Sequence, residues 1–125
     1  MEKYKIGPDE FSDWDWKNIL EEEYEWFVYW YEASGYEGSG VAITKCKSGG
    51  YDLFGLGHCS SFCPLEDGPI HLNDVASVQA MCLLDEGLPN RPRNPEDYDH
   101  ERYHKLWMWL RNRSEFVGLP DITNF

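Results

Sequence analysis

The residues best equipped for chemistry lie in one short polar segment, residues 58–63, with the sequence HCSSFC. Two cysteines four positions apart on a tight turn can supply two of the soft ligands that zinc prefers in a tetrahedral site. The predicted ligands are Cys46, His58, Cys59, Cys63 and Cys82, with His71 as a further candidate. Because the spacing lacks two C-x2-C pairs, buried free thiols are the alternative interpretation.

A nucleophilic cysteine is a second use of the same segment. Cys59 directly follows a histidine, but the side chains of adjacent residues usually point apart, so the fold would have to bring in another histidine as the base. The available histidines are His71, His100 and His104, and nothing in their spacing selects one. A zinc- or thiol-dependent enzyme that uses residues 58–63 is therefore an alternative function.

Acidic and aromatic residues are interleaved near the start of the chain. The net charge is −12, and residues 1–37 hold 11 acidic residues against 3 basic ones. This charge argues against binding to nucleic acid or to an anionic membrane, since both are polyanions. Carboxylates in a row can instead imitate phosphates, with aromatic side chains as anchors in a basic partner, although an ordinary solvated helix face is the alternative. The predicted partner-binding residues are Asp13, Trp14, Asp15, Glu21, Glu22, Glu23 and Glu25.

Four arginines offer a different kind of site. Guanidinium groups bind phosphates through paired hydrogen bonds and stack on aromatic rings. A protein that sequesters a small nucleotide signal is therefore another alternative. Its ligand-binding residues would be Arg91, Arg93, Arg111 and Arg113. The arginines form two pairs, and the members of each pair are two residues apart, so they do not share a helix face. This spacing favours ion pairs between the arginines and neighbouring acidic residues instead.

The first half of the chain predicts a helix followed by three strands. Ser12 and the carboxylate three positions on have the form of a helix cap, so a helix is expected over residues 13–23. Aromatic and β-branched residues favour a strand at 24–33, and its two apolar faces indicate a central strand. After a glycine-rich turn at 34–40, strands at 41–46 and 51–57 complete an antiparallel meander.

The second half predicts two helices joined by loops. Residues 58–69 are polar and broken by prolines, which is typical of a loop. A helix is expected from Asn73 to near Gly87, and residues 88–93 are expected to form a loop. The last helix begins at the Asn94 cap and buries Tyr103, Leu106, Trp107 and Leu110. The expected fold is a single α+β domain over residues 1–125, with an N-terminal helix, a three-stranded antiparallel meander and two C-terminal helices.

The chain lacks features of export or membrane insertion. No run approaches the roughly 20 apolar residues that a membrane span needs, and the first residues lack the apolar core of a signal peptide. We therefore expect a cytoplasmic protein with reduced thiols.

Part of the sequence resembles small bacteriophage and prophage accessory proteins. The shared features are YEGSGVA at 36–42, GHCS at 57–60 and PLE at 64–66, within a region of similarity that covers residues 24–67. Those proteins carry a cysteine at the position of Ser61 and a glycine at the position of Cys63, so the thiol positions do not coincide. The resemblance implies a phage-like origin and an accessory role in infected cells, and it supplies no catalytic activity.

These observations predict a non-enzymatic protein that binds and inhibits a basic host protein. The expected partner is a nucleic-acid-binding defence enzyme, such as a CRISPR-type nuclease, whose nucleic-acid channel the acidic residues would occupy. No cofactor is required by this interpretation, and zinc is the one cofactor that the cysteines leave open.

Overall fold

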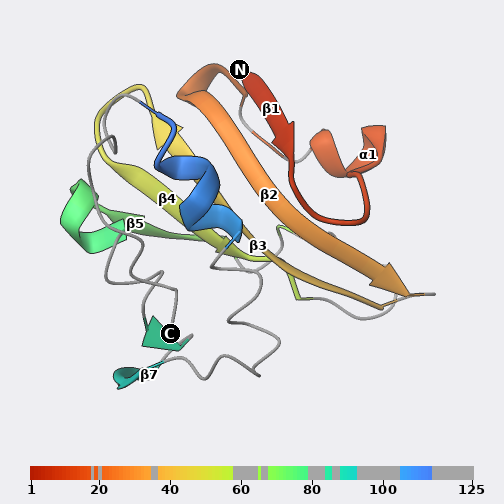
Figure 1. The fold of residues 1–125 in the computed structure, drawn as a ribbon. Helices are drawn as coiled ribbons and strands as arrows, with labels where there is room; N and C mark the ends of the chain where they lie inside the picture. The colour runs from red at the N-terminus through yellow and green to blue at the C-terminus, as the bar shows by residue number, and fades with distance from the viewer. Residues whose placement is uncertain are drawn as a thin grey trace.

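A five-stranded mixed sheet is the main element of the computed structural model (Figure 1). The structure describes residues 1–17, 19, 21–34, 37–57, 65, 68–78, 84–85, 88–92 and 105–113. The strands, in spatial order, are β1 (Glu2–Lys5), β2 (Tyr24–Ser34), β3 (Glu37–Cys46), β4 (Tyr51–Gly55) and β5 (Pro69–Leu72). β1 is parallel to β2, and the other neighbours are antiparallel. The short strands β6 (Leu84–Asp85) and β7 (Leu88–Pro92) form a separate antiparallel pair.

The described helical segments are short. The cap expected at the start of α1 (Asp13–Trp16) is confirmed, because Ser12 Oγ accepts from the Asp15 amide and the Asp15 carboxylate accepts from the Ser12 amide. A 3-10 turn, η1 (Glu21–Glu23), leads into β2. Residues 75–78 and 105–110 are also helical. Among the described residues, no helix combines the length and apolarity that crossing a bilayer requires.

The expected fold of one N-terminal helix, a three-stranded meander and two C-terminal helices is wrong. β2, β3 and β4 do form an antiparallel meander, but the sheet extends to β1 on one side and to β5 on the other. The helix expected over 13–23 ends at Trp16, where the Trp16 carbonyl accepts from the Ile19 amide in a turn. β6 lies within the expected helix that starts at Asn73, and β7 replaces the expected loop at 88–93. The missed strands are short, and hydrogen bonding to a neighbouring strand stabilises each of them.

The described residues of the glycine-rich segment 34–40, which was expected to be a turn, belong to strands, since β2 ends at Ser34 and β3 begins at Glu37. Gly40 pairs with Tyr31 of β2, and a Cβ at Gly40 would lie 2.0 Å from the Trp30 carbonyl oxygen. Glycine therefore serves here to let two strands approach closely within the sheet.

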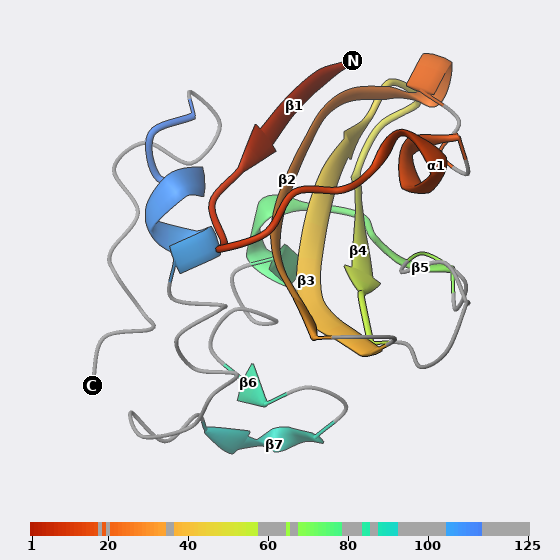
Figure 2. The same ribbon diagram turned by 90° about the vertical axis from the view of Figure 1, so that its right-hand side faces the viewer.

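The sheet separates two hydrophobic clusters. In β2 the even-numbered residues 26–30 face one cluster and the odd-numbered residues 27–31 face the other, which confirms the expected central strand with two apolar faces. The segment 105–110 covers the cluster on the even-numbered face of β2. Phe11 and Ile19, which flank α1, cover the cluster on the odd-numbered face. Figure 2 shows the 105–110 helix and α1 on opposite sides of β2. The expected burial of Leu106, Trp107 and Leu110 is confirmed, whereas Tyr103 lies outside the described residues.

Candidate functional site

A group of polar side chains meets where β2, β3, β4 and β5 lie side by side. Tyr24 pairs with Cys46 between β2 and β3, and Asp52 pairs with both Thr44 on β3 and His71 on β5. Residues directly opposite each other on neighbouring strands place their side chains on the same face of a sheet. The pairing register therefore gathers these side chains from four strands at one place.

A β-bulge directs Tyr24 into this group. Cys46 and Lys45 are consecutive on β3, but their partners on β2, Tyr24 and Trp26, are two residues apart. The extra residue, Glu25, reverses the alternation of side chains at that point. Tyr24 consequently packs in the cluster that contains Cys46, while Trp26 packs in the cluster on the opposite face.

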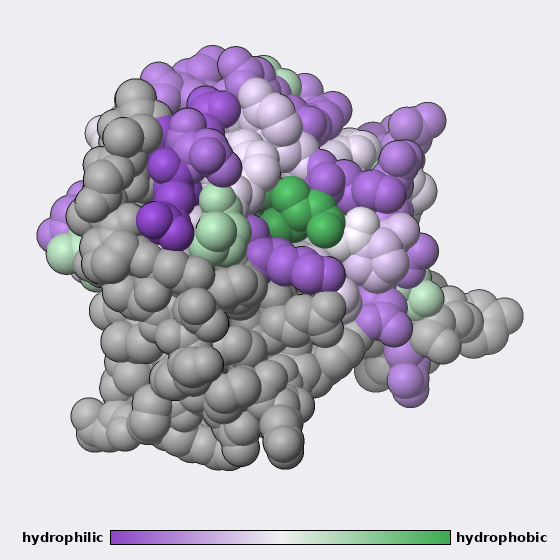
Figure 3. All heavy atoms as spheres, viewed as in Figure 1, coloured by the Kyte–Doolittle hydropathy of each residue, from purple (hydrophilic) through white to green (hydrophobic). Residues whose placement is uncertain are grey.

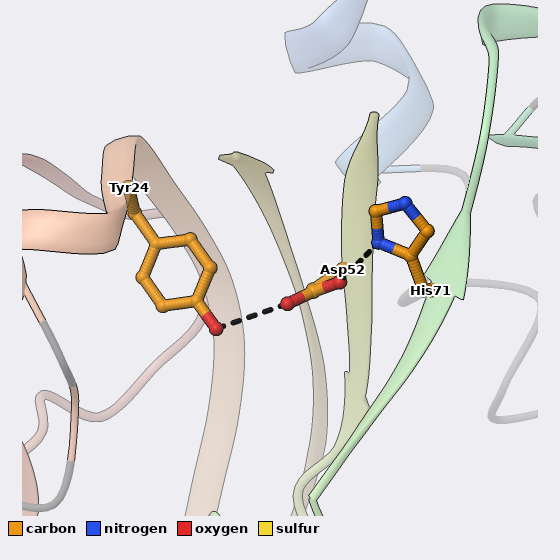
Figure 4. Close-up of polar contacts among 3 residues, drawn as sticks. All are labelled: Tyr24, Asp52 and His71. Atoms are coloured by element: carbon orange, nitrogen blue, oxygen red, sulfur yellow. Dashed lines mark hydrogen bonds and ion pairs between the residues drawn. The ribbon is translucent and has the colours of Figure 1, made fainter. Parts of the chain in front are cut away.

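Asp52 is the centre of this group, here called the polar cluster, whose other members are Tyr24, Cys46 and His71. The Tyr24 hydroxyl donates to Asp52 Oδ2 at 3.0 Å, and His71 Nδ1 lies 2.8 Å from Asp52 Oδ1 (Figure 4). The Cys46 thiol also forms a hydrogen bond with Asp52. Asp52 is only 8% exposed, and a buried carboxylate is costly unless hydrogen bonds replace its hydration. The three neighbours supply that replacement.

Burial and the Asp52 carboxylate hold protons on two of these neighbours. Burial and, after it, the charge of Asp52 and its hydrogen bond raise the pKa of the Cys46 thiol to about 11, although the hydroxyl of Thr44 acts in the opposite direction. Burial and, after it, the hydrogen bond to Asp52 also raise the pKa of Tyr24 above its ordinary value. In this arrangement Cys46 is a protonated thiol at neutral pH, which argues against its use as an activated nucleophile.

The polar cluster opens to solvent through a pocket of about 340 Å³. The pocket is lined by Glu23, Tyr24, Cys46, Lys47, Ser48, Asp52 and His71. His71 is half-exposed, whereas Cys46 and Asp52 are buried, so the imidazole stands between the buried groups and solvent. The pocket can therefore admit a small ligand or ion to the buried thiol and carboxylate.

The predicted partner-binding residues lie on α1, on η1 and at the start of β2. Asp15 caps α1, and Glu21 Oε1 lies 2.7 Å from Lys3 Nζ, which lowers the pKa of Glu21. The same Lys3 ammonium lies 4.6 Å from the centroid of the Trp16 ring, so the end of α1 and η1 are neighbours. The exposed members of the predicted set are Asp13, Trp14, Glu22, Glu23 and Glu25.

The two described arginine side chains of the predicted nucleotide site have contacts within the chain. The guanidinium of Arg113 lies 5.3 Å from the ring centroids of Trp26 and Trp109 and 5.6 Å from that of Tyr4. Arg111 donates to the sulfur of Met108 at 3.6 Å. Arg91 lies in β7, where side chains are not described, and Arg93 lies outside the described residues.

The predicted metal ligands are only partly covered by the structure. Cys46 and His71 meet in the polar cluster, whereas His58, Cys59, Cys63 and Cys82 lie outside the described residues. Sequence analysis missed Tyr24 and Asp52. Asp52 carries a usable signal, because aspartate is depleted in strands and this one interrupts an apolar strand sequence.

Comparisons with protein-family models, with curated proteins and with solved structures found no match.

Proposed function

We propose that this protein is a binding module that presents an acidic surface to a basic partner protein. The surface, here called the acidic patch, consists of Asp13, Trp14, Glu22, Glu23 and Glu25. The observation that carries the proposal is the exposure of Trp14, which is 53% accessible to solvent while the other five tryptophans are buried or half-buried. Tryptophan is enriched among the residues that dominate binding energy at interfaces, so an exposed indole beside carboxylates fits a docking anchor.

The charge of the acidic patch defines the chemistry of the partner. The four carboxylates of the patch attract a surface rich in lysine and arginine, and such attraction accelerates association and weakens with salt. Around α1, at the upper right of Figure 3, the described surface is mostly hydrophilic. This character suits an interface in which charge provides steering and Trp14 provides apolar contact.

The partner class that we propose is a nucleic-acid-binding host enzyme, such as a defence nuclease, in the bacterial cytoplasm. Such enzymes carry basic channels for the phosphates of DNA or RNA, and the carboxylates of the patch would occupy one of these channels. The resemblance of residues 24–67 to phage proteins is the reason for placing this encounter in an infected cell. The protein then acts as an inhibitor without catalytic activity of its own.

Capture from a bacterial lysate tests the acidic patch. The tagged protein is incubated with lysate at low salt and at about 0.5 M salt, where electrostatic attraction is strongly screened, and bound proteins are identified by mass spectrometry. We expect recovery of a basic nucleic-acid-binding protein at low salt only. The Glu22→Lys/Glu25→Lys variant and the Trp14→Ala variant should both lose it, and an oligonucleotide that the partner binds should displace the wild-type protein.

The matched control places the same charge change at the other end of the β2–β3 ladder. Glu32 and Glu37 lie at the Ser34 end of that ladder, far along the strands from Tyr24 and Cys46. The Glu32→Lys/Glu37→Lys variant should therefore retain the partner. Equal loss in both double variants would mean that net charge alone drives capture, and retention by the Glu22→Lys/Glu25→Lys variant would exclude the acidic patch as the interface.

A further inference from the structure

We propose that Cys46, Asp52 and His71 form a zinc site. The thiol sulfur, a carboxylate oxygen and an imidazole nitrogen of these residues all lie within 4.8 Å of one another. Ligand atoms of a tetrahedral zinc ion are about 3.3–3.8 Å apart, given zinc–ligand distances of about 2.0–2.3 Å. Small side-chain movements therefore suffice for all three atoms to bind one ion. None of these three ligands belongs to the acidic patch.

The donor atoms select zinc among common cations. Thiolate and imidazole are poor ligands for Mg²⁺ and Ca²⁺, which prefer oxygen, but they are the usual ligands of Zn²⁺. When the ion binds, the Cys46 thiol releases its proton to solvent, and His71 binds through Nδ1 with its remaining proton on Nε2. The thiolate and the Asp52 carboxylate then cancel the 2+ charge of the ion, which suits a largely buried position.

The fold holds the three ligands before any ion binds. Cys46 and Asp52 flank the tight turn at residues 47–50, in which the Cys46 amide donates to the Gly50 carbonyl at 3.0 Å. A Cβ at Gly50 would lie 2.8 Å from atoms of the His71 ring, so the backbone of this turn supports the imidazole directly. The Tyr24 hydroxyl fixes the orientation of Asp52, as hydrogen bonds to metal-binding carboxylates commonly do.

The site leaves one coordination position for a further ligand. Three protein ligands do not complete a tetrahedron, and zinc ions with three protein ligands commonly hold a water molecule or a substrate at the fourth position. The adjoining pocket of about 340 Å³ has room for such a ligand. Glu23 lines the same pocket and offers a further carboxylate at its edge.

Cobalt substitution tests this assignment with the full chain. Protein stripped with a chelator is titrated with Co²⁺ and, in parallel, with Zn²⁺, and bound metal is counted by elemental analysis. We expect one ion per chain and the intense near-ultraviolet absorption that arises from charge transfer between a thiolate and Co²⁺. Cys46→Ser should abolish this band, and Asp52→Asn and His71→Ala should each weaken binding at least about tenfold. Glu37→Gln removes an exposed carboxylate that lies outside the pocket and should leave metal binding unchanged.

The remaining thiols provide the decisive comparison. In the Cys59→Ser/Cys63→Ser/Cys82→Ser variant, Cys46 is the single cysteine of the chain, and we expect the charge-transfer band and the stoichiometry to persist. Loss of the band in this variant, or its persistence in Cys46→Ser, would assign the metal to other thiols and overturn the proposal. Absence of stoichiometric binding to the wild-type protein would overturn it as well. Near-ultraviolet circular dichroism verifies that each variant is folded, and the triple variant remains informative if Cys46→Ser is not.

Discussion

Individual side chains in this sheet are constrained by the burial of their polar atoms. Tyr29 is an example, because its ring stacks on Phe11 with centroids 4.3 Å apart while its hydroxyl oxygen accepts a hydrogen bond from the Phe11 amide at 3.2 Å. Burial raises the pKa of the Tyr29 hydroxyl above its ordinary value of 10.0. The neutral phenol is therefore the form that the native fold accommodates.

This shift predicts a loss of stability in alkaline solution. Below about pH 10 the Tyr29 phenol is protonated in the native and in the unfolded state. Above about pH 10 the unfolded chain releases this proton while the native state retains it. The free energy of unfolding should therefore fall as the pH rises above about 10. Urea unfolding at a series of pH values measures this slope. Tyr29→Phe should reduce the slope and, by removing the acceptor for the Phe11 amide, should cost about 1 kcal/mol at neutral pH. An unchanged slope in Tyr29→Phe would contradict this account.

At the scale of elements, the pairing of β2 with β3 depends on close backbone contact at Gly40. A Cβ at this position would lie far inside the contact distance to the Trp30 carbonyl, so Gly40→Ala must push the strands apart or distort one of them. We expect a destabilisation of about 2–3 kcal/mol, seen as a lower urea midpoint. Gly57→Ala is the control, because no atom lies within 4 Å of a Cβ at Gly57. Equal midpoints for the two variants would show that the strands yield without cost.

Local sequence pattern was informative where an element is long and buried. The run of aromatic and β-branched residues in β2 indicated a central strand because both faces of that strand are covered by other parts of the chain. β1 and β5 have four residues each and lie at the edges of the sheet; β1 is mostly charged, and β5 begins with a proline. Their conformation follows from pairing with β2 and β4, which no local pattern encodes.

The polar cluster was predictable only in part for the same reason. Cys46 and His71 were recognised as possible ligands by residue type. Their meeting with Asp52 depends on β5, which sequence analysis missed, and the place of Tyr24 depends on a bulge at Glu25 that only the register reveals. Residue type therefore identified candidate ligands, whereas strand pairing determined which of them meet.

At the scale of the whole molecule, different parts of the chain cover the two faces of the sheet, and Arg113 joins one of these parts to two strands of the sheet. Its guanidinium contacts Tyr4 of β1, Trp26 of β2 and Trp109 in the segment that follows the sheet. It also lies 3.9 Å from a carboxylate oxygen of Glu2 and donates to the Tyr4 hydroxyl at 3.5 Å. A cation surrounded by aromatic rings is held by ring electrostatics as well as by packing.

Removal of this cation should therefore weaken the contact between the two ends of the described chain. We expect Arg113→Ala to lower the free energy of unfolding by about 1–2 kcal/mol, because cation–π contacts that are partly shielded from water contribute in that range. Arg111→Ala is the matched control, since it removes the same charge from a side chain two residues away and should cost less. Arg113→Lys keeps the charge but not the planar group, so an intermediate loss is expected. Because the contacts of Arg113 are partly buried, the difference in unfolding free energy between Arg113→Ala and Arg111→Ala should persist at high salt. A difference that vanishes at high salt would mean that Arg113 acts only through its exposed ion pair with Glu2.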